Sequence, residues 1–181
     1  MASFLTTALA ALLAVLTGLM WVTPATLAGE EVTPQEVIAK VKEAATYLAK
    51  DGKAGLETFD RADSLFVWQN TYVFVWDCTA DKIVAHPVEG VGLTISTLKD
   101  ATGKLMGPEM CKTAKRPNGG WVEYMWPKPV KERHAGGLAY AEKPSRKVTY
   151  MLGVEGTPYQ VGAGEYNDAL SVKQLDALLP E

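Results

Sequence analysis

The chain has 181 residues, with 18 Lys and Arg against 21 Asp and Glu and a formal net charge of -3. All these charges follow residue 28, and residues 29–181 suffice for one ordinary domain with its own core. The slight negative charge gives no electrostatic basis for binding nucleic acid or an anionic membrane surface.

The N-terminal segment is apolar and uncharged. Residues 4–22 form an almost continuous apolar run, and the small residues Thr26 and Ala28 precede the first acidic side chains. This pattern predicts a signal peptide over residues 1–28, cleaved after Ala28. The alternative is an uncleaved membrane anchor, because about 19 apolar residues can span a bilayer. Both interpretations place a domain of residues 29–181 outside the cytoplasm, periplasmic or secreted.

A long helix is predicted at the start of this domain. Thr33 and Glu36 have the spacing of a capping box, and Pro34 occupies the first helical position. Apolar residues then recur at helical spacing up to Leu48, and Gly52 ends the pattern. One face of this helix is therefore expected to pack against a core.

Two strands follow as a hairpin. Residues 72–78 (YVFVWDC) form the first strand, and residues 82–87 (KIVAHP) return antiparallel after a short turn. A connection of about 30 residues comes next, and helical turns are expected within residues 105–114.

Three more strands are expected in the second half. Residues 121–126 place Trp121 on one face and Tyr124 and Trp126 on the other, and Pro127 is expected to end that strand. Residues 128–143 are expected to form a loop. Strands over residues 146–154 and 159–166 and a short helix over residues 171–179 complete the chain. The order predicts an α+β domain with a five-stranded antiparallel sheet, a long N-terminal helix and short flanking helices.

The two cysteines, Cys78 and Cys111, suit an oxidising compartment. We expect a disulfide between them, although two separate buried thiols or a catalytic cysteine are alternatives. Enzyme signatures are missing: the chain has no G-x-S-x-G and no H-E-x-x-H. Neither His86 nor His134 has a second histidine at metal-ligand spacing. We expect no enzymatic activity, no metal and no cofactor.

Four spaced motifs resemble the extracytoplasmic single Cache domain family. They are YVFVWD with VAHP, LKDATGKL, GGWVEYMWPKP, and SRKVTYM with PYQVGAGEY, in the order of the family. The resemblance implies a PAS-like fold and a sensor that binds small extracellular molecules, often carboxylates such as acetate, propionate or pyruvate. Members commonly act in chemotaxis and other signal transduction between two membrane spans. No second span follows here, so a separate membrane receptor or kinase is the expected partner.

A carboxylate pocket requires oriented donors and a cation. We expect the walls to come from the following residues: His86, Tyr124, Trp126, Arg146, Lys147 and Tyr150. Each has a plain alternative as a core aromatic, a backbone-bonded histidine or a solvated surface cation. The alternative function is a protein–protein interaction module whose pocket is filled by its own aromatic side chains.

Overall fold

The computed structural model describes residues 31–132 and 137–180. The predicted signal peptide over residues 1–28 lies outside these residues, as does His134. None of the described helices combines the length and apolar character needed to cross a membrane.

The sheet is antiparallel and has six strands, one more than expected. The strands are β1 (Val67–Trp68), β2 (Thr71–Asp77), β3 (Lys82–Ala85), β4 (Gly120–Lys131), β5 (Leu138–Gly153) and β6 (Tyr159–Glu165). Their order is β1-β2-β6-β5-β4, and β3 pairs with β2. The prediction of five strands was wrong because the two-residue β1, which pairs with the start of β2, is too short to show a period-two pattern.

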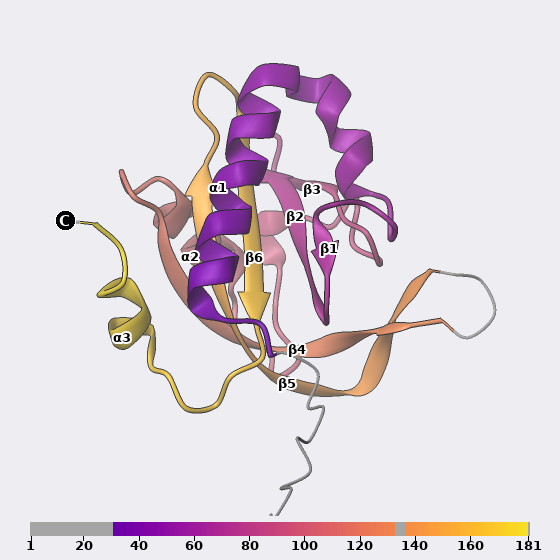
Figure 1. The fold of residues 1–181 in the computed structure, drawn as a ribbon, viewed down its shortest axis with the longest axis vertical. Coiled ribbons are helices and arrows are strands. Elements are labelled where there is room, and N and C mark those ends of the chain that lie inside the picture. The colour runs from indigo at the N-terminus through magenta and orange to yellow at the C-terminus, as the bar shows by residue number, and fades with distance from the viewer. Residues whose placement is uncertain (1–30, 133–136, 181) are drawn as a thin grey trace, which may run out of the picture.

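Helices cover both faces of the sheet (Figure 1). The helical elements are α1 (Pro34–Asp51), α2 (Gly107–Ala114), α3 (Val172–Asp176) and the 3₁₀ helices η1 (Gly52–Phe59) and η2 (Ile95–Thr97). The predicted capping box at the start of α1 is present, because the Thr33 side chain accepts from the Glu36 N–H and the Glu36 carboxylate accepts from the Thr33 N–H. Asp51 is the last residue of the helix and Gly52 its C-cap.

Two separate cores lie on the two faces. On the α1 face, the apolar stripe of the helix packs against inward residues of the sheet such as Trp121 and Tyr150. On the opposite face, Phe74 and Tyr124 pack with Met110 of α2. The alternation expected for residues 121–126 is confirmed, since Trp121 and Tyr124 fall in different cores.

The predictions that a strand ends at Pro127 and that residues 128–143 form a loop were wrong. β4 and β5 continue past Pro127 as a long hairpin that projects from the sheet (Figure 1). β4 is an edge strand, so its prolines are tolerated despite the missing N–H donors. The pairing is irregular between Pro127 and Pro129, and it resumes with Pro129 opposite Tyr140. This register brings Tyr140 back over the second core.

Candidate functional site

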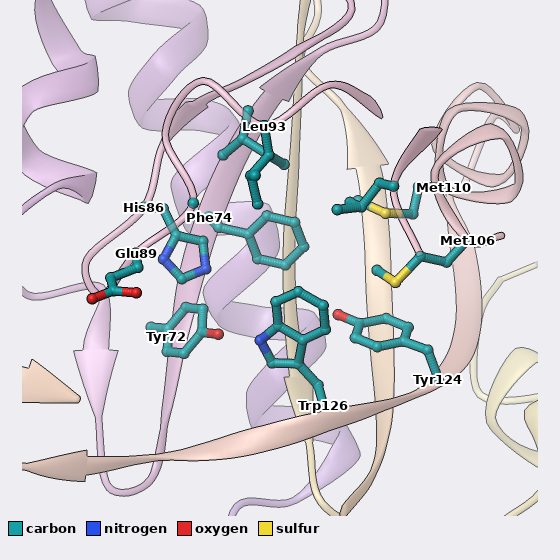
Figure 2. Close-up of a pocket in the computed structure, with 12 residues that line it drawn as sticks. Tyr72, Phe74, His86, Glu89, Leu93, Met106, Met110, Tyr124 and Trp126 are labelled. Carbon is teal, nitrogen blue, oxygen red and sulfur yellow. The ribbon is translucent and has the colours of Figure 1, made fainter. Parts of the chain in front are cut away.

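A small cavity lies in the second core, between the sheet and α2 (Figure 2). It is lined by Tyr72, Phe74, Ile83, His86, Leu98, Met106, Met110, Tyr124 and Trp126, and at its rim by Glu89, Gly90 and Leu93. The internal volume is about 20 Å³, close to the minimum that one water molecule requires. The cavity is therefore small, and its lining is mostly apolar.

Lys147 is buried beside this cavity. Its side chain extends from β5 on the same face as Tyr124, and only 1% of the residue is exposed. Its Nζ lies 4.2 Å from the ring centroid of Tyr72 and 5.4 Å from that of Tyr166. No carboxylate in the described part of the chain forms an ion pair with it. Burial consequently lowers the pKa of Lys147 from 10.5 to about 7.

His86 connects to two tyrosines at the cavity wall. Its Nδ1 accepts from the Val88 N–H at 3.2 Å, and its Nε2 lies 3.3 Å from the Tyr140 hydroxyl. The Tyr140 hydroxyl in turn lies 3.0 Å from that of Tyr72. Burial and the positive charge of Lys147 lower the pKa of His86 to about 3, so the ring is neutral.

Tyr124 and Trp126 both line the cavity. Thr149 donates to the Tyr124 hydroxyl at 2.8 Å, and burial raises the Tyr124 pKa beyond its ordinary range. The rings of Tyr124 and Trp126 meet edge to face, and Trp126 makes the same kind of contact with Tyr140. The result is a rigid aromatic wall whose polar tips are neutral.

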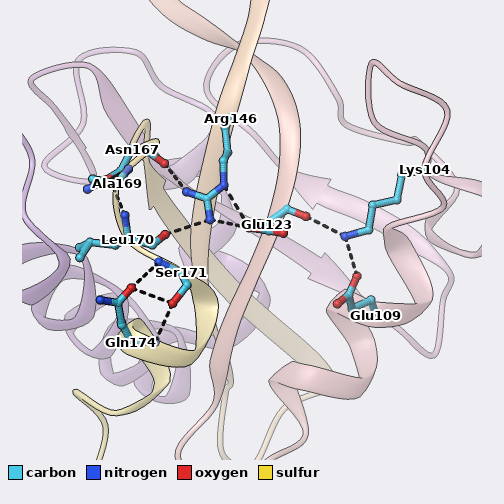
Figure 3. A network of polar contacts seen from close by, with 9 residues as sticks. All are labelled: Lys104, Glu109, Glu123, Arg146, Asn167, Ala169, Leu170, Ser171 and Gln174. Carbon is cyan, nitrogen blue, oxygen red and sulfur yellow. Dashed lines mark hydrogen bonds and ion pairs between the residues drawn. The ribbon is translucent and has the colours of Figure 1, made fainter.

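Arg146 points to the other face and does not join the cavity. Its guanidinium donates to the Glu123 carboxylate and to the backbone carbonyls of Asn167 and Leu170 (Figure 3). The Lys104 ammonium in turn donates to the Glu123 carbonyl. Through the Asn167 and Leu170 carbonyls, Arg146 fixes the segment after β6 onto the sheet. Its donors already have acceptors within the fold, so they are not available to a ligand.

Tyr150 also faces away from the cavity. Its ring packs beside Trp121 in the α1-side core, and its hydroxyl donates to the Asn118 carbonyl at 2.8 Å. Of the six residues expected at the pocket, the structure brings His86, Tyr124, Trp126 and Lys147 together and separates Arg146 and Tyr150 from them.

The sequence model of the single Cache domain 2 family matches residues 6–170 of this chain. The protein belongs to the single Cache domain family. Two solved structures support the same fold. A Cache chemosensory domain described for carboxylic acid recognition is 23% identical, with a TM-score of 0.50, and the match covers 72% of this chain and 86% of that one. A methyl-accepting chemotaxis protein from Vibrio parahaemolyticus is 16% identical, with a TM-score of 0.51, and the match covers 74% and 88%.

The expected disulfide of this Cache domain is present in the structure. Cys78 follows β2 and Cys111 lies on α2, with their Cα atoms 6.0 Å apart. The bond ties α2, which carries Met110 and directly follows Met106, to the end of the strand that carries Phe74. It therefore holds two walls of the cavity together. No group of three or more His, Cys, Asp or Glu side chains suited to a metal occurs within residues 31–132 and 137–180.

Three tyrosines of this site are missing from the sequence-based set: Tyr72 lines the cavity, Tyr140 hydrogen-bonds to Tyr72, and the Tyr166 ring lies 5.4 Å from the Lys147 Nζ. Tyr72 shares its face with Phe74 and Trp76, so the pattern indicated only a core residue. Tyr140 fell in the segment expected to be a loop, although the alternation in residues 138–141 (LAYA) is a weak strand signal. Tyr166 directly follows β6, and its hydroxyl donates to the Pro127 carbonyl.

Proposed function

We propose that this Cache domain is an extracytoplasmic sensor that binds a short organic carboxylate, such as acetate, propionate or pyruvate, beside Lys147. The observation that carries the proposal is the buried Lys147 ammonium, which has no anionic partner among the described residues and lies next to an apolar cavity. A ligand carboxylate supplies the missing charge, and the cavity accepts its apolar carbon atoms.

The cost of an unpaired buried charge supports this proposal. An isolated ammonium away from water either loses its proton or requires an anion and further hydrogen bonds. An apolar residue at position 147 would stabilise the core more than a buried lysine does, so the fold gives up stability at this position. Such an arrangement is expected where the charge serves a ligand.

The cavity must widen to admit a ligand, since 20 Å³ does not hold four or more heavy atoms. Its rim offers the most direct route. Glu89, Gly90 and Leu93 lie in the connection after β3, where Val91 and Leu93 expose much of their side chains. Two backbone hydrogen bonds join Gly92 and Leu93 to Ile83 of β3, so outward movement of this rim breaks those two bonds but leaves the pairing of β2 with β3 and β6 in place.

Transmission of the signal is assigned to a separate membrane receptor or kinase. The domain itself is exported through the segment predicted as a signal peptide at residues 1–28, or remains tethered by it. The proposed ligand class is the one that the similar Cache chemosensory domain is described as recognising.

The test is a binding screen of residues 29–181 against short carboxylates, amino acids and amines. A ligand of four to six heavy atoms has a limit of about -6 to -9 kcal/mol, which corresponds to a dissociation constant of about 0.3 μM at best. At 100 times its dissociation constant it stabilises the fold by about 2.7 kcal/mol, a readily measured thermal shift. A folded sample that responds to no carboxylate contradicts the proposal.

The small cavity volume favours one alternative, a protein–protein interaction module whose pocket is filled by its own aromatic rings. The two functions differ in their response to Tyr124→Ala. For a sensor, this substitution abolishes ligand binding while the sheet stays folded. For an interaction module, no ligand is lost, and the exposed rim around Val91 and Leu93 becomes the surface to test for partners.

A further inference from the structure

The hydrogen bonds around His86 have a defined direction. The Val88 N–H can only donate, so the Nδ1 atom that it contacts at 3.2 Å must be unprotonated. The neutral ring therefore carries its proton on Nε2. The atom facing Nε2 is the Tyr140 hydroxyl oxygen, 3.3 Å away, and it accepts that proton's hydrogen bond.

The hydrogen bond from His86 also determines which hydroxyl donates between Tyr140 and Tyr72. The Tyr140 oxygen already accepts from His86. The hydrogen bonds form a continuous chain when Tyr140 donates its own hydroxyl proton to the Tyr72 oxygen, 3.0 Å away. A chain in which each member accepts once and donates once is favoured, since its bonds polarise one another. The Tyr72 oxygen is then an acceptor for Tyr140, and the Tyr72 proton is left over. No hydrogen-bond acceptor for that proton occurs within the described residues other than Tyr140 itself.

The leftover proton lies on the same ring that contacts Lys147. Tyr72 lines the cavity, and the Lys147 Nζ is 4.2 Å from its ring centroid. An anion placed beside Lys147 and Tyr72 therefore contacts two donors. One is the Lys147 ammonium, and the other is the Tyr72 hydroxyl, whose proton points away from Tyr140. Tyr140 makes no carboxylate contact in this arrangement, but it decides whether Tyr72 acts as a donor.

We propose that Tyr140 is a specificity-determining positioning residue, which directs the Tyr72 hydroxyl proton at the ligand so that the pocket selects a hydrogen-bond acceptor. This inference rests on the proposed carboxylate binding and deepens it. It also gives the projecting β4–β5 hairpin a role, because the hairpin register brings Tyr140 within hydrogen-bonding distance of Tyr72 and His86.

The first test needs no ligand. The chain has two histidines, so His134→Gln leaves only His86 to be observed by ¹⁵N NMR. At pH 7 we expect a neutral ring with the proton on Nε2 and a bare Nδ1. A proton on Nδ1, or a doubly protonated ring, overturns the inference while leaving the proposed function intact.

The second test compares propionate with propionamide, its uncharged isostere that carries N–H donors. In Tyr140→Phe the Tyr72 hydroxyl is free to turn, so we expect propionate affinity to fall about fivefold to tenfold. Propionamide affinity should fall by a clearly smaller factor, because the amide can present its N–H group to a Tyr72 oxygen that has turned. The matched control is Tyr47→Phe, which removes a partly buried hydroxyl bonded to Thr58 near the end of α1. The control should show wild-type affinity for both compounds.

The outcomes separate the two proposals. Equal weakening of both compounds by Tyr140→Phe indicates a purely structural role and overturns the inference, and so does an unchanged affinity for propionate. If the folded wild-type domain binds neither propionate nor any other short carboxylate, the proposed function fails and the inference fails with it.

Discussion

Arg146 and Lys147 are adjacent on β5 but serve opposite faces of the sheet. The Arg146 guanidinium binds the Glu123 carboxylate and two backbone carbonyls, whereas the Lys147 ammonium lies over the Tyr72 ring without an anionic partner in the described residues. Strand alternation alone produces this division. One cation therefore holds the fold together, and the other is the one that we propose binds the ligand.

Lys147→Met should stabilise the unliganded domain and abolish carboxylate binding. Methionine fills a similar volume without a buried charge, so we expect a gain of about 1–3 kcal/mol in unfolding free energy at pH 6. The matched control is Lys128→Met, since Lys128 also lies 5.4 Å from the Tyr166 ring but is exposed. Denaturant unfolding and calorimetric titration measure the two effects. Retained binding in Lys147→Met contradicts the proposed site.

Arg146→Met should have the opposite profile. It removes the contacts to Asn167 and Leu170 that fix the segment after β6, so we expect a loss of about 1–2 kcal/mol in unfolding free energy. The partly exposed ion pair with Glu123 adds little to this. Carboxylate affinity at 25 °C should stay within twofold of wild type, because the side chain lies on the face away from the cavity. A loss of binding by a folded variant would place Arg146 in the recognition machinery.

The sequence predicted the elements with strong local patterns. The capping box and apolar stripe defined α1, and the alternation around Tyr124 separated the two faces correctly. The hairpin was missed because Pro127 and Pro129 indicate a strand end, and only knowledge that β4 is an edge strand removes that objection. Edge position is a property of the complete sheet and not of the local sequence.

The site was predictable only in part, for a similar reason. Tyr124 and Trp126 could be placed on one face from their spacing, whereas the alternation of β5 separates Lys147 from Arg146 and Tyr150 without showing which of them shares a face with Tyr124. Tyr72 and Tyr140 are separated by 68 residues, and their contact depends on how far the irregular hairpin shifts its register. No local pattern encodes such a contact, so the hydrogen-bond chain through His86 emerges only from the assembled fold.

Reduction of the disulfide should loosen the cavity wall formed by α2. The bond between Cys78 and Cys111 spans 33 residues, so we expect its loss to cost about 3–4 kcal/mol in unfolding free energy. The folded variant should also bind the carboxylate more weakly than wild type, because the cavity residues Met106 and Met110 lie on or beside the helix that the bond holds in place. A Cys78→Ala, Cys111→Ala double variant measured by denaturant unfolding and ligand titration checks both effects. Unchanged stability in that variant contradicts the expected contribution.

The stability of the unliganded domain should rise between pH 7 and pH 9. The pKa of Lys147 is lowered by burial to about 7 in the folded state against 10.5 in the unfolded chain. Within that window the unfolded state holds more protons, so unfolding free energy increases with pH. Burial raises the pKa of Tyr72 and Tyr124, which reverses the trend only above about pH 10. The difference between wild type and Lys147→Met, measured by urea unfolding, isolates this contribution. A difference that is constant over the window contradicts it.

Carboxylate affinity should fall as the pH rises above 7. The ligand pairs with the charged form of Lys147, whose pKa is about 7 before binding and is raised by contact with an anion. Binding above pH 7 therefore takes up a proton, and the dissociation constant increases by up to tenfold for each pH unit. His86 does not contribute, since its pKa of about 3 leaves it neutral throughout. Calorimetry in phosphate and Tris buffers, which differ in ionisation enthalpy, counts the protons taken up.

Glu89 at the rim and the exposed Lys128 near Tyr166 are the other charged groups that face this region. The Lys147→Arg variant is the control, because a guanidinium stays charged over the whole range and should bind, where it binds at all, without pH dependence. A flat wild-type profile from pH 6.5 to 9 would mean that the carboxylate does not bind through Lys147.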